Sequence, residues 1–148
     1  MSAAVGIPAW VDRWVGLPFV ERGRGPAEFD CWGLFRAAVL EQWGVDLPSH
    51  ADAYTTEADR ADLARIIEGS LDGWTEIPAS EARLGDGVLI RVLGDECHVG
   101  LVVAPGWMLH TFRGRDSTVE PLSAVAWRNR VVGYFRHAAI AGAGAARG

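Results

Sequence analysis

A cysteine at the start of a predicted helix is the residue best placed to do covalent chemistry. Cys31, one of two cysteines in the chain, opens the helix-forming run in "FDCWGLFRAAV". A thiol attacks as its thiolate, and the N–H groups and dipole of a helix's first turn favour an anion. The same N–H groups could stabilise the oxyanion of acyl transfer. This position indicates a nucleophile, but it also suits a cysteine that only packs in the core.

Two of the four histidines could serve such a thiol as a base. His98 and His110 lie in the predicted strands "CHVGLVV" and "WMLHTF", whereas His50 lies in a polar loop and His137 beside the C-terminal tail. One histidine on a strand is more often structural than catalytic. Two on adjacent strands, together with a cysteine at a helix start, match the arrangement of nucleophile, base and orienting group.

The hairpin between the two histidines decides whether their side chains meet. A hairpin centred on Ala104 would place His98 and His110 directly opposite each other, but the turn signal is Pro105–Gly106. This offset makes the pair diagonal unless a bulge intervenes, and an even loop would put the side chains on opposite faces. We therefore expect an odd loop or a β-bulge, in part because of the family resemblance described below.

Helices precede strands among the elements that must position these residues. Asp30 can cap a helix that runs from Cys31 to Gly44, and shorter helices are predicted for "PAWVDRWVG" and after Thr56. Strands are predicted at "GDGVLIRVL", "CHVGLVV", "WMLHTF", "STVEPL" and "VVGYFRH", with a brief helix at "SAVAWRN". The long helix should turn four residues to the core: Leu34, Phe35, Ala38 and Val39. This order predicts an α+β domain with N-terminal helices packed on a small antiparallel sheet.

Length and composition limit the class of protein. The chain has 148 residues and a formal net charge of -5, which fits one globular domain, expected at residues 1–137, and a flexible tail at 138–148. The basic residues are scattered, which argues against nucleic acid as a partner. No apolar run approaches the roughly 20 residues that span a bilayer. The N-terminus lacks the pattern of a signal peptide, so we expect synthesis in a bacterial cytoplasm.

Four motifs together resemble the NlpC/P60 family of papain-like cysteine peptidases. They are "FDCWGL", "GDGVLIR", "HVGLVV" and "MLHT". In order and spacing they match the family's Asp-Cys-x-Gly-Leu helix, Gly-Asp strand, His-Val-Gly strand and second histidine. Each motif alone is weak, but the ordered set covers roughly residues 10–137. The variant "GLPF…FDCWGL…LP" is similar to the branch carried by phage tails and gene-transfer particles.

The resemblance implies a papain-like fold and a mechanism. Cys31 would be the nucleophile, His98 the general base, and His110 the residue that orients the His98 imidazole, with no metal or cofactor. Family members cleave the stem peptides of bacterial peptidoglycan, often between D-glutamate and a diamino acid. Resemblance to the phage-type branch further implies tail-tip or hub proteins as partners. It also implies that the protein is carried on a virion or gene-transfer particle and opens the target cell wall locally. Transport on a particle would suit an N-terminus without the signal-peptide pattern.

Several residues depart from the family pattern. Phe19 stands where many cell-wall members have a tyrosine that helps to form the oxyanion site, so another donor or the backbone must serve. Trp32 replaces the more usual serine. Cys97 precedes His98 and should point to the other face of the strand. This alternation argues against a Cys31–Cys97 disulfide and against a zinc site on Cys97 and His98.

Two other functions stay open from the sequence. The protein could be a structural tail-tip component that kept the fold and lost the activity, in which case Cys31 should react slowly with alkylating agents. The same cysteine and histidines could also serve an amidase or an acyltransferase, because specificity lies in the groove and not in the nucleophile. The masses of the products would separate these activities.

Overall fold

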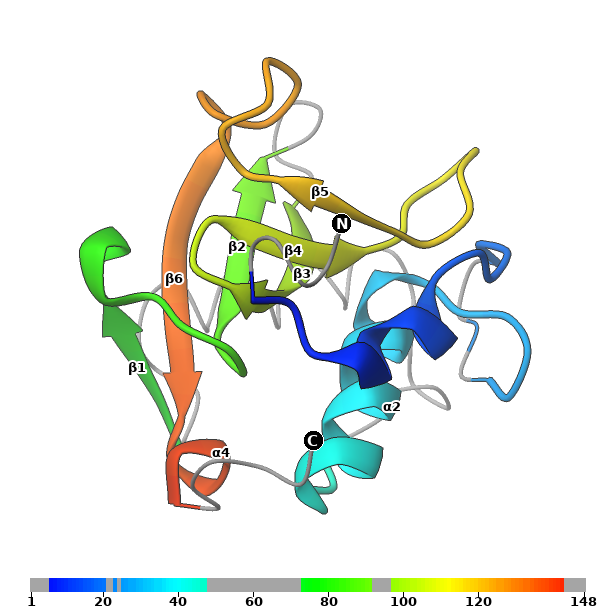
Figure 1. Cartoon of the computed structure of the whole chain (residues 1–148), viewed down its shortest axis with the longest axis horizontal. Coiled ribbons are helices and arrows are strands. Elements are labelled where there is room, and N and C mark those ends of the chain that lie inside the picture. Colours follow the sequence, from blue (N-terminus) through cyan, green and yellow to red (C-terminus); the bar gives the residue numbers. More distant parts are fainter. Residues whose placement is uncertain (1–5, 21–22, 24, 48–72, 92–96, 143–148) are drawn as a thin grey trace.

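A six-stranded antiparallel sheet, with one long helix against it, forms the centre of the protein (Figure 1). The computed structural model describes residues 6–20, 23, 25–47, 73–91 and 97–142. The strands are β1 (Trp74–Ile77), β2 (Gly87–Arg91), β3 (Cys97–Ala104), β4 (Trp107–His110), β5 (Thr118–Pro121) and β6 (Val131–His137). Their order across the sheet is β1-β6-β2-β3-β4-β5. The predicted α+β class, with helix packed on sheet, is confirmed.

The long helix, α2 (Cys31–Trp43), begins and ends where its capping residues predict. The Asp30 carboxylate accepts a hydrogen bond from the Gly33 N–H at 2.7 Å, and Gly44 ends the helix in the left-handed conformation at φ 70°. The helix packs against β3 and β4. All four side chains predicted to face the core are buried: Leu34, Phe35, Ala38 and Val39.

Three short helices complete the helical part of the described ranges. The 3-10 helix η1 (Ala9–Trp14) lies beside α2, where the Trp10 and Trp43 rings meet edge to face with centroids 5.8 Å apart. The other two are η2 (Ala79–Glu81) and α4 (Ala138–Gly142). Within the described segments, no helix has the length and apolar character needed to cross a bilayer.

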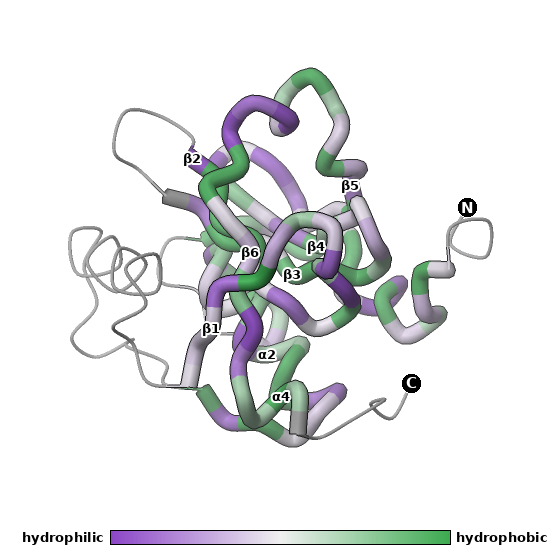
Figure 2. The backbone as a smooth tube through the Cα atoms, turned by 90° about the vertical axis from the view of Figure 1, so that its left-hand side faces the viewer, coloured by the Kyte–Doolittle hydropathy of each residue, from purple (hydrophilic) through white to green (hydrophobic). Residues whose placement is uncertain are grey.

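Apolar side chains form one core on each face of the sheet. The larger core lies between the sheet and α2, and the smaller core lies on the opposite face. Successive residues of β3 alternate between them, with Leu101 and Val103 in the larger core and Val102 in the smaller. Figure 2 shows the hydrophobic segments of β3 and α2 in the middle of the molecule.

The Gly-Asp motif before β2 anchors two strands to each other. Asp86 is buried, and its carboxylate accepts hydrogen bonds from the Arg136 guanidinium at 2.7 and 2.9 Å. A third hydrogen bond comes from the backbone N–H of Arg83 at 2.9 Å. The hydrogen bonds to Asp86 raise the pKa of Arg136. The motif thus ties the start of β2 to β6 and has a structural role.

Some secondary-structure predictions are wrong. The segment "SAVAWRN" forms turns and not a helix. Trp127 is buried in the smaller core, and its backbone N–H donates a hydrogen bond to the Ala124 carbonyl in a tight turn. Strand β1 has no counterpart in the sequence prediction, because it is only four residues long and is followed directly by Pro78.

The C-terminal segment also differs from its prediction. A flexible tail was expected from residue 138, but this segment begins as α4, because Ile140 packs into the larger core and the Ala138 N–H donates to the Gly73 carbonyl at 2.7 Å. The helix predicted after Thr56 and the last six residues lie outside the described residues.

Candidate active site

Cys31 is the first residue of α2 and directly follows the capping residue Asp30. It carries a thiol and not a disulfide, is partly exposed, and packs against the larger core. The N–H groups and dipole of the first helical turn favour a thiolate at this position. The predicted position at the helix start is confirmed, whereas the nucleophilic role stays a prediction.

Gly33 allows the segment ahead of the helix to approach α2 closely. A Cβ atom at Gly33 would lie 2.0 Å from the carbonyl oxygen of Gly23, far inside van der Waals contact. The Asp30 N–H donates to this same carbonyl at 3.2 Å. The glycine of the "DCWGL" motif therefore fixes the chain that borders Cys31.

Phe19 lies beside the residues that lead into α2. It pairs with Phe29 in an isolated parallel bridge. The Phe29 N–H donates to the Pro18 carbonyl at 3.1 Å, and the Val20 N–H donates to the Phe29 carbonyl at 3.0 Å. A phenyl ring has no hydroxyl to donate, so an oxyanion formed at Cys31 would need backbone N–H groups or a donor other than residue 19.

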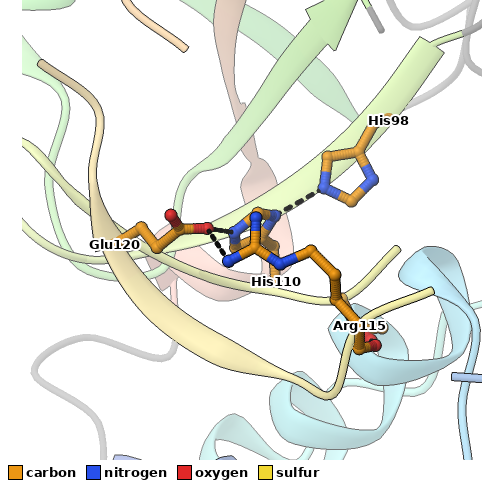
Figure 3. Close-up of polar contacts among 5 residues, drawn as sticks. His98, His110, Arg115 and Glu120 are labelled. Carbon is orange, nitrogen blue, oxygen red and sulfur yellow. Dashed lines mark hydrogen bonds and ion pairs between the residues drawn. The ribbon is translucent and has the colours of Figure 1, made fainter. Parts of the chain in front are cut away.

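His98 and His110 form a hydrogen-bonded line with Glu120 (Figure 3). Nε2 of His98 lies 2.7 Å from Nδ1 of His110, and Nε2 of His110 lies 2.6 Å from Oε2 of Glu120. The histidines are 3% and 1% exposed. The three side chains come from the adjacent strands β3, β4 and β5. The structure therefore brings together the two histidines singled out in the sequence and adds a carboxylate to them.

A β-bulge places both histidines on one face of the sheet. The register between β3 and β4 shifts between Val102 and Ala104. The two-residue turn at Pro105–Gly106 would by itself put His98 and His110 on opposite faces, and the extra residue in β3 corrects this. Of the two alternatives expected from the sequence, an odd loop or a bulge, the structure has the bulge.

Two aromatic side chains enclose the histidine pair. The ring centroid of Trp127 lies 6.2 Å from that of His98 and 5.1 Å from that of His110. The Phe112 ring lies 5.5 and 6.0 Å from the same two imidazoles. These apolar rings replace water around the imidazoles, which makes a positive charge there costly.

Burial controls the charge of this line. Burial, followed by the nearby His110, holds the pKa of His98 well below its usual value of 6.5. Burial also lowers the pKa of His110, although the hydrogen bond to Glu120 opposes this shift. Partial burial acts to raise the pKa of Glu120, but the hydrogen bond and charge of His110, followed by the nearby Trp127 and Arg115, outweigh it and lower the pKa. At neutral pH the line holds two neutral imidazoles and one carboxylate.

Ser117 ties the loop after β4 to the segment ahead of α2. Its hydroxyl donates to the Trp14 carbonyl at 2.6 Å and accepts from the Leu17 N–H at 2.9 Å. Its own N–H donates to the Leu17 carbonyl, and its carbonyl accepts from the Gly16 N–H, both at 2.8 Å. These four hydrogen bonds join the chain that leads to the helix start to the loop between β4 and β5.

The helix and the histidines belong to elements that contact each other. α2 packs against β3 and β4 on the face of the larger core, whereas the imidazoles lie on the face of the smaller core. The pairing of β3 with β4 ends at Leu101 and Leu109. His98 lies beyond this pair, still beside β2. A reaction that couples Cys31 to His98 would take place at this end of the sheet.

Two residues of the site were missed in the sequence, Glu120 and Trp127. Glu120 had a usable signal: Thr118 pairs with His110 and Glu120 with Met108, so alternation along β5 puts Glu120 on the face of the histidine. Trp127 had none, because the turns that bring it onto the imidazoles follow no simple period.

The arrangement of the site differs from that of a metal centre. In the described ranges, no group of three or more histidine, cysteine or carboxylate side chains is arranged to hold a metal ion. His98, His110 and Glu120 bond in a line and do not converge on one point. The side chain of Cys97, weighed with His98 as a zinc ligand, lies outside the described residues.

Known proteins are similar to this chain in sequence. The chain is 24% identical over 124 residues to a probable endopeptidase p60 of Listeria grayi. It is 28% identical over 130 residues to a probable endopeptidase p60 of Listeria welshimeri. The matches cover 84% and 86% of this chain but 21% of each relative, so the chain spans about a fifth of the length of these relatives.

Solved structures share the fold. A protein from Staphylococcus aureus, described as similar to a lipoprotein of the NLP/P60 family, has a TM-score of 0.61 at 23% identity and is matched over 84% of this chain and 38% of its own. The NlpC/p60 domain of the peptidoglycan hydrolase SagA has a TM-score of 0.56 at 24% identity, over 85% of this chain and 93% of its own. The model of the NlpC/P60 family matches residues 16–136, a range that contains Cys31 and the whole histidine line. This protein therefore belongs to the NlpC/P60 family.

Proposed function

We propose that this protein is a cysteine peptidase that hydrolyses the stem peptides of bacterial peptidoglycan. The observation that carries the proposal is the buried His98–His110 hydrogen bond, in a family member whose long helix starts with Cys31. Further support comes from relatives named as probable endopeptidases and from a structural neighbour named as a peptidoglycan hydrolase.

The proposed reaction is acyl transfer through a thioester. His98 takes the proton of Cys31, and the thiolate attacks the carbonyl carbon of the scissile peptide bond. Backbone N–H groups at the start of α2 stabilise the oxyanion. The C–N bond then breaks as His98 returns the proton to the leaving amine. Water, deprotonated by His98, then attacks the thioester carbonyl carbon. The C–S bond breaks, the product leaves as a carboxylic acid, and His98 returns the proton to the Cys31 sulfur, while His110 holds the His98 imidazole in place.

The proposed bond and the proposed carrier rest on sequence resemblance. The bond is the one between D-glutamate and a diamino acid. The carrier is a phage-like tail, suggested by the variant "GLPF…FDCWGL…LP". In this proposal the chain contacts tail-tip or hub proteins and reaches the target envelope on a virion or a gene-transfer particle. It then opens the wall locally.

Digestion of purified peptidoglycan, with Cys31→Ala in parallel, tests the activity. We expect new stem-peptide fragments from the wild type only, with masses that identify the bond, and an unchanged melting temperature for the variant. Hydrolysis retained by Cys31→Ala would overturn the proposal. Fragments released at the sugar–peptide amide would instead identify an amidase. An inactive protein whose Cys31 reacts slowly with iodoacetamide at neutral pH would be a structural component.

Isolation of particles from the producing cells tests the carrier. We expect an antibody against the chain to detect it in purified particles and to label the tail tip in electron micrographs. Detection in the cell lysate but not in the particles would contradict the carrier and leave the peptidase proposal intact.

A further inference from the structure

We propose that Glu120 is a positioning residue that sets the order of the protons along the His98–His110 pair. The inference rests on the proposed peptidase function, because it concerns how the same site prepares its base. Its starting point is the line in Figure 3, with distances of 2.6 Å from Glu120 Oε2 to His110 Nε2 and 2.7 Å from His110 Nδ1 to His98 Nε2.

The chemistry of the three groups leaves one order of protons. A carboxylate can only accept, so Nε2 of His110 must carry a proton and donate it to Glu120. A neutral imidazole carries a single proton, so Nδ1 of His110 is an acceptor. Nε2 of His98 therefore donates to His110, and Nδ1 of His98 has no proton. With Glu120 ionised, Nδ1 is the nitrogen of His98 that can take the proton of a thiol.

Without a carboxylate at position 120 the opposite order becomes possible. Two neutral imidazoles joined by one hydrogen bond can donate in either direction. In the reversed order His110 donates to Nε2 of His98, and Nδ1 of His98 carries the proton. Such a molecule has no base to offer the thiol. Glu120 disfavours this inactive order, because Nε2 of His110 would then be unprotonated and would face the Glu120 carboxylate, so two acceptors would meet.

Glu120 also offsets the charge that the reaction creates. When His98 takes a proton it becomes a cation in a place that is 3% exposed. The groups around it are His110 and the apolar rings of Phe112 and Trp127. The line as a whole then contains one imidazolium and one carboxylate, so its net charge is zero.

Arg115 suggests a competing explanation for Glu120. Nη2 of Arg115 lies 3.6 Å from Oε2 of Glu120, so the carboxylate could simply be half of a surface ion pair. The Arg115 side chain is 45% exposed, and such pairs contribute little. His110 and Arg115 are the charged or titratable groups found to act on Glu120. Replacing Arg115 therefore separates the two explanations.

The test uses Glu120→Gln with two matched controls. The amide keeps the size of the side chain, loses its charge, and can either accept from His110 or donate to it. Glu76→Gln makes the same change on β1, at the opposite edge of the sheet, where Glu76 is exposed. Arg115→Gln removes the ion pair and leaves the line intact. Melting temperatures confirm that each variant is folded.

The first readout is the tautomer of each histidine, from ¹⁵N NMR of protein labelled at histidine. Spectra of His98→Gln and His110→Gln assign the signals. We expect the Nε2–H form at both positions in the wild type, in Glu76→Gln and in Arg115→Gln, and mixed forms at His98 in Glu120→Gln. This readout needs no substrate, so it stands whether or not the protein proves to be a peptidase. The Nε2–H form unchanged in Glu120→Gln would overturn the proposal.

The second readout is the reactivity of Cys31 and the turnover of substrate. In Glu120→Gln the midpoint of the pH profile for alkylation should move upward by about one pH unit, because the imidazolium loses its counter-charge. On stem peptide, kcat should fall by about tenfold or more with KM unchanged. Equal losses in Arg115→Gln and Glu120→Gln would favour the ion-pair explanation and contradict ours.

Discussion

The hydroxyl of Ser117 and the carbonyl oxygen of Trp14 lie 2.6 Å apart, although 103 positions separate the two residues in the chain. Ser117 is 2% exposed, so this hydrogen bond is shielded from water. It connects the segment that leads to α2 with the loop between His110 and Glu120. The geometry of the candidate site thus depends on a residue with no part in the chemistry.

Replacing Ser117 with alanine should weaken both the fold and the site. The Trp14 carbonyl and the Leu17 N–H would lose a hydrogen-bond partner in the interior, which costs about 2 kcal/mol. We expect urea denaturation to show this loss in the free energy of unfolding, and peptide hydrolysis to slow. Ser123→Ala, at an exposed serine, is the matched control and should change neither quantity. An unaltered unfolding curve for Ser117→Ala would contradict the linking role.

Gly33→Ala should disrupt the start of α2. The new methyl group would be placed 2.0 Å from the Gly23 carbonyl, which is backbone and can yield only if the segment moves. We expect a loss of about 3 kcal/mol in the free energy of unfolding, measured by chemical denaturation. Gly87→Ala is the control, since its Cβ would meet the Phe35 ring at an ordinary 3.4 Å. Similar losses in both variants would show that the close approach is not the cause.

Arg136→Met should destabilise the protein without affecting the thiol. It leaves the buried Asp86 carboxylate without its ion pair, at a cost of about 3 kcal/mol. The matched control is Arg13→Met, which breaks an exposed pair with Glu41 and should cost well under 1 kcal/mol. Thermal melts and the alkylation rate of Cys31 give the two readouts. A changed alkylation rate in folded Arg136→Met would give the Gly-Asp motif a role in the chemistry.

The stability of the fold should decrease as the pH falls below about 6.5. The pKa of His98 is well below 6.5 in the folded protein, and that of His110 is also lowered, so the unfolded chain takes up more protons in this range. Each extra proton lowers the free energy of unfolding by about 1.4 kcal/mol per pH unit. Urea titrations between pH 8 and pH 5 measure the slope, and His98→Gln should reduce it. A flat profile would be inconsistent with buried neutral imidazoles.

Local rules predicted helix α2 well. Asp30 and Gly44 mark its ends because caps act through hydrogen bonds within a few residues, and those residues are visible in the sequence. An odd loop or a bulge between the histidines was also inferred, because strand alternation makes an even turn incompatible with a shared face and the family resemblance implied that the two histidines share one.

Other features depend on contacts that the sequence does not show. The turns at 122–130 form because Trp127 packs onto imidazoles from two other strands, which overrides the helical propensity of the segment. Ser117 gave no signal at all, because its partners are distant in sequence. Glu120 is intermediate, since alternation places it on the right face but cannot show that it reaches His110.

β5 has four residues, lies at an edge of the sheet, and is hydrogen-bonded to β4. Short edge strands open by local fluctuations that need less free energy than global unfolding. Because Glu120 is on β5, each opening would take the carboxylate away from His110 while α2 and the central strands stay folded. The fraction of molecules with an intact candidate site would then depend on the local opening equilibrium of β5. Fast amide hydrogen exchange in β5 would report this opening. Warming would inactivate the site at a temperature below the melting point of the domain.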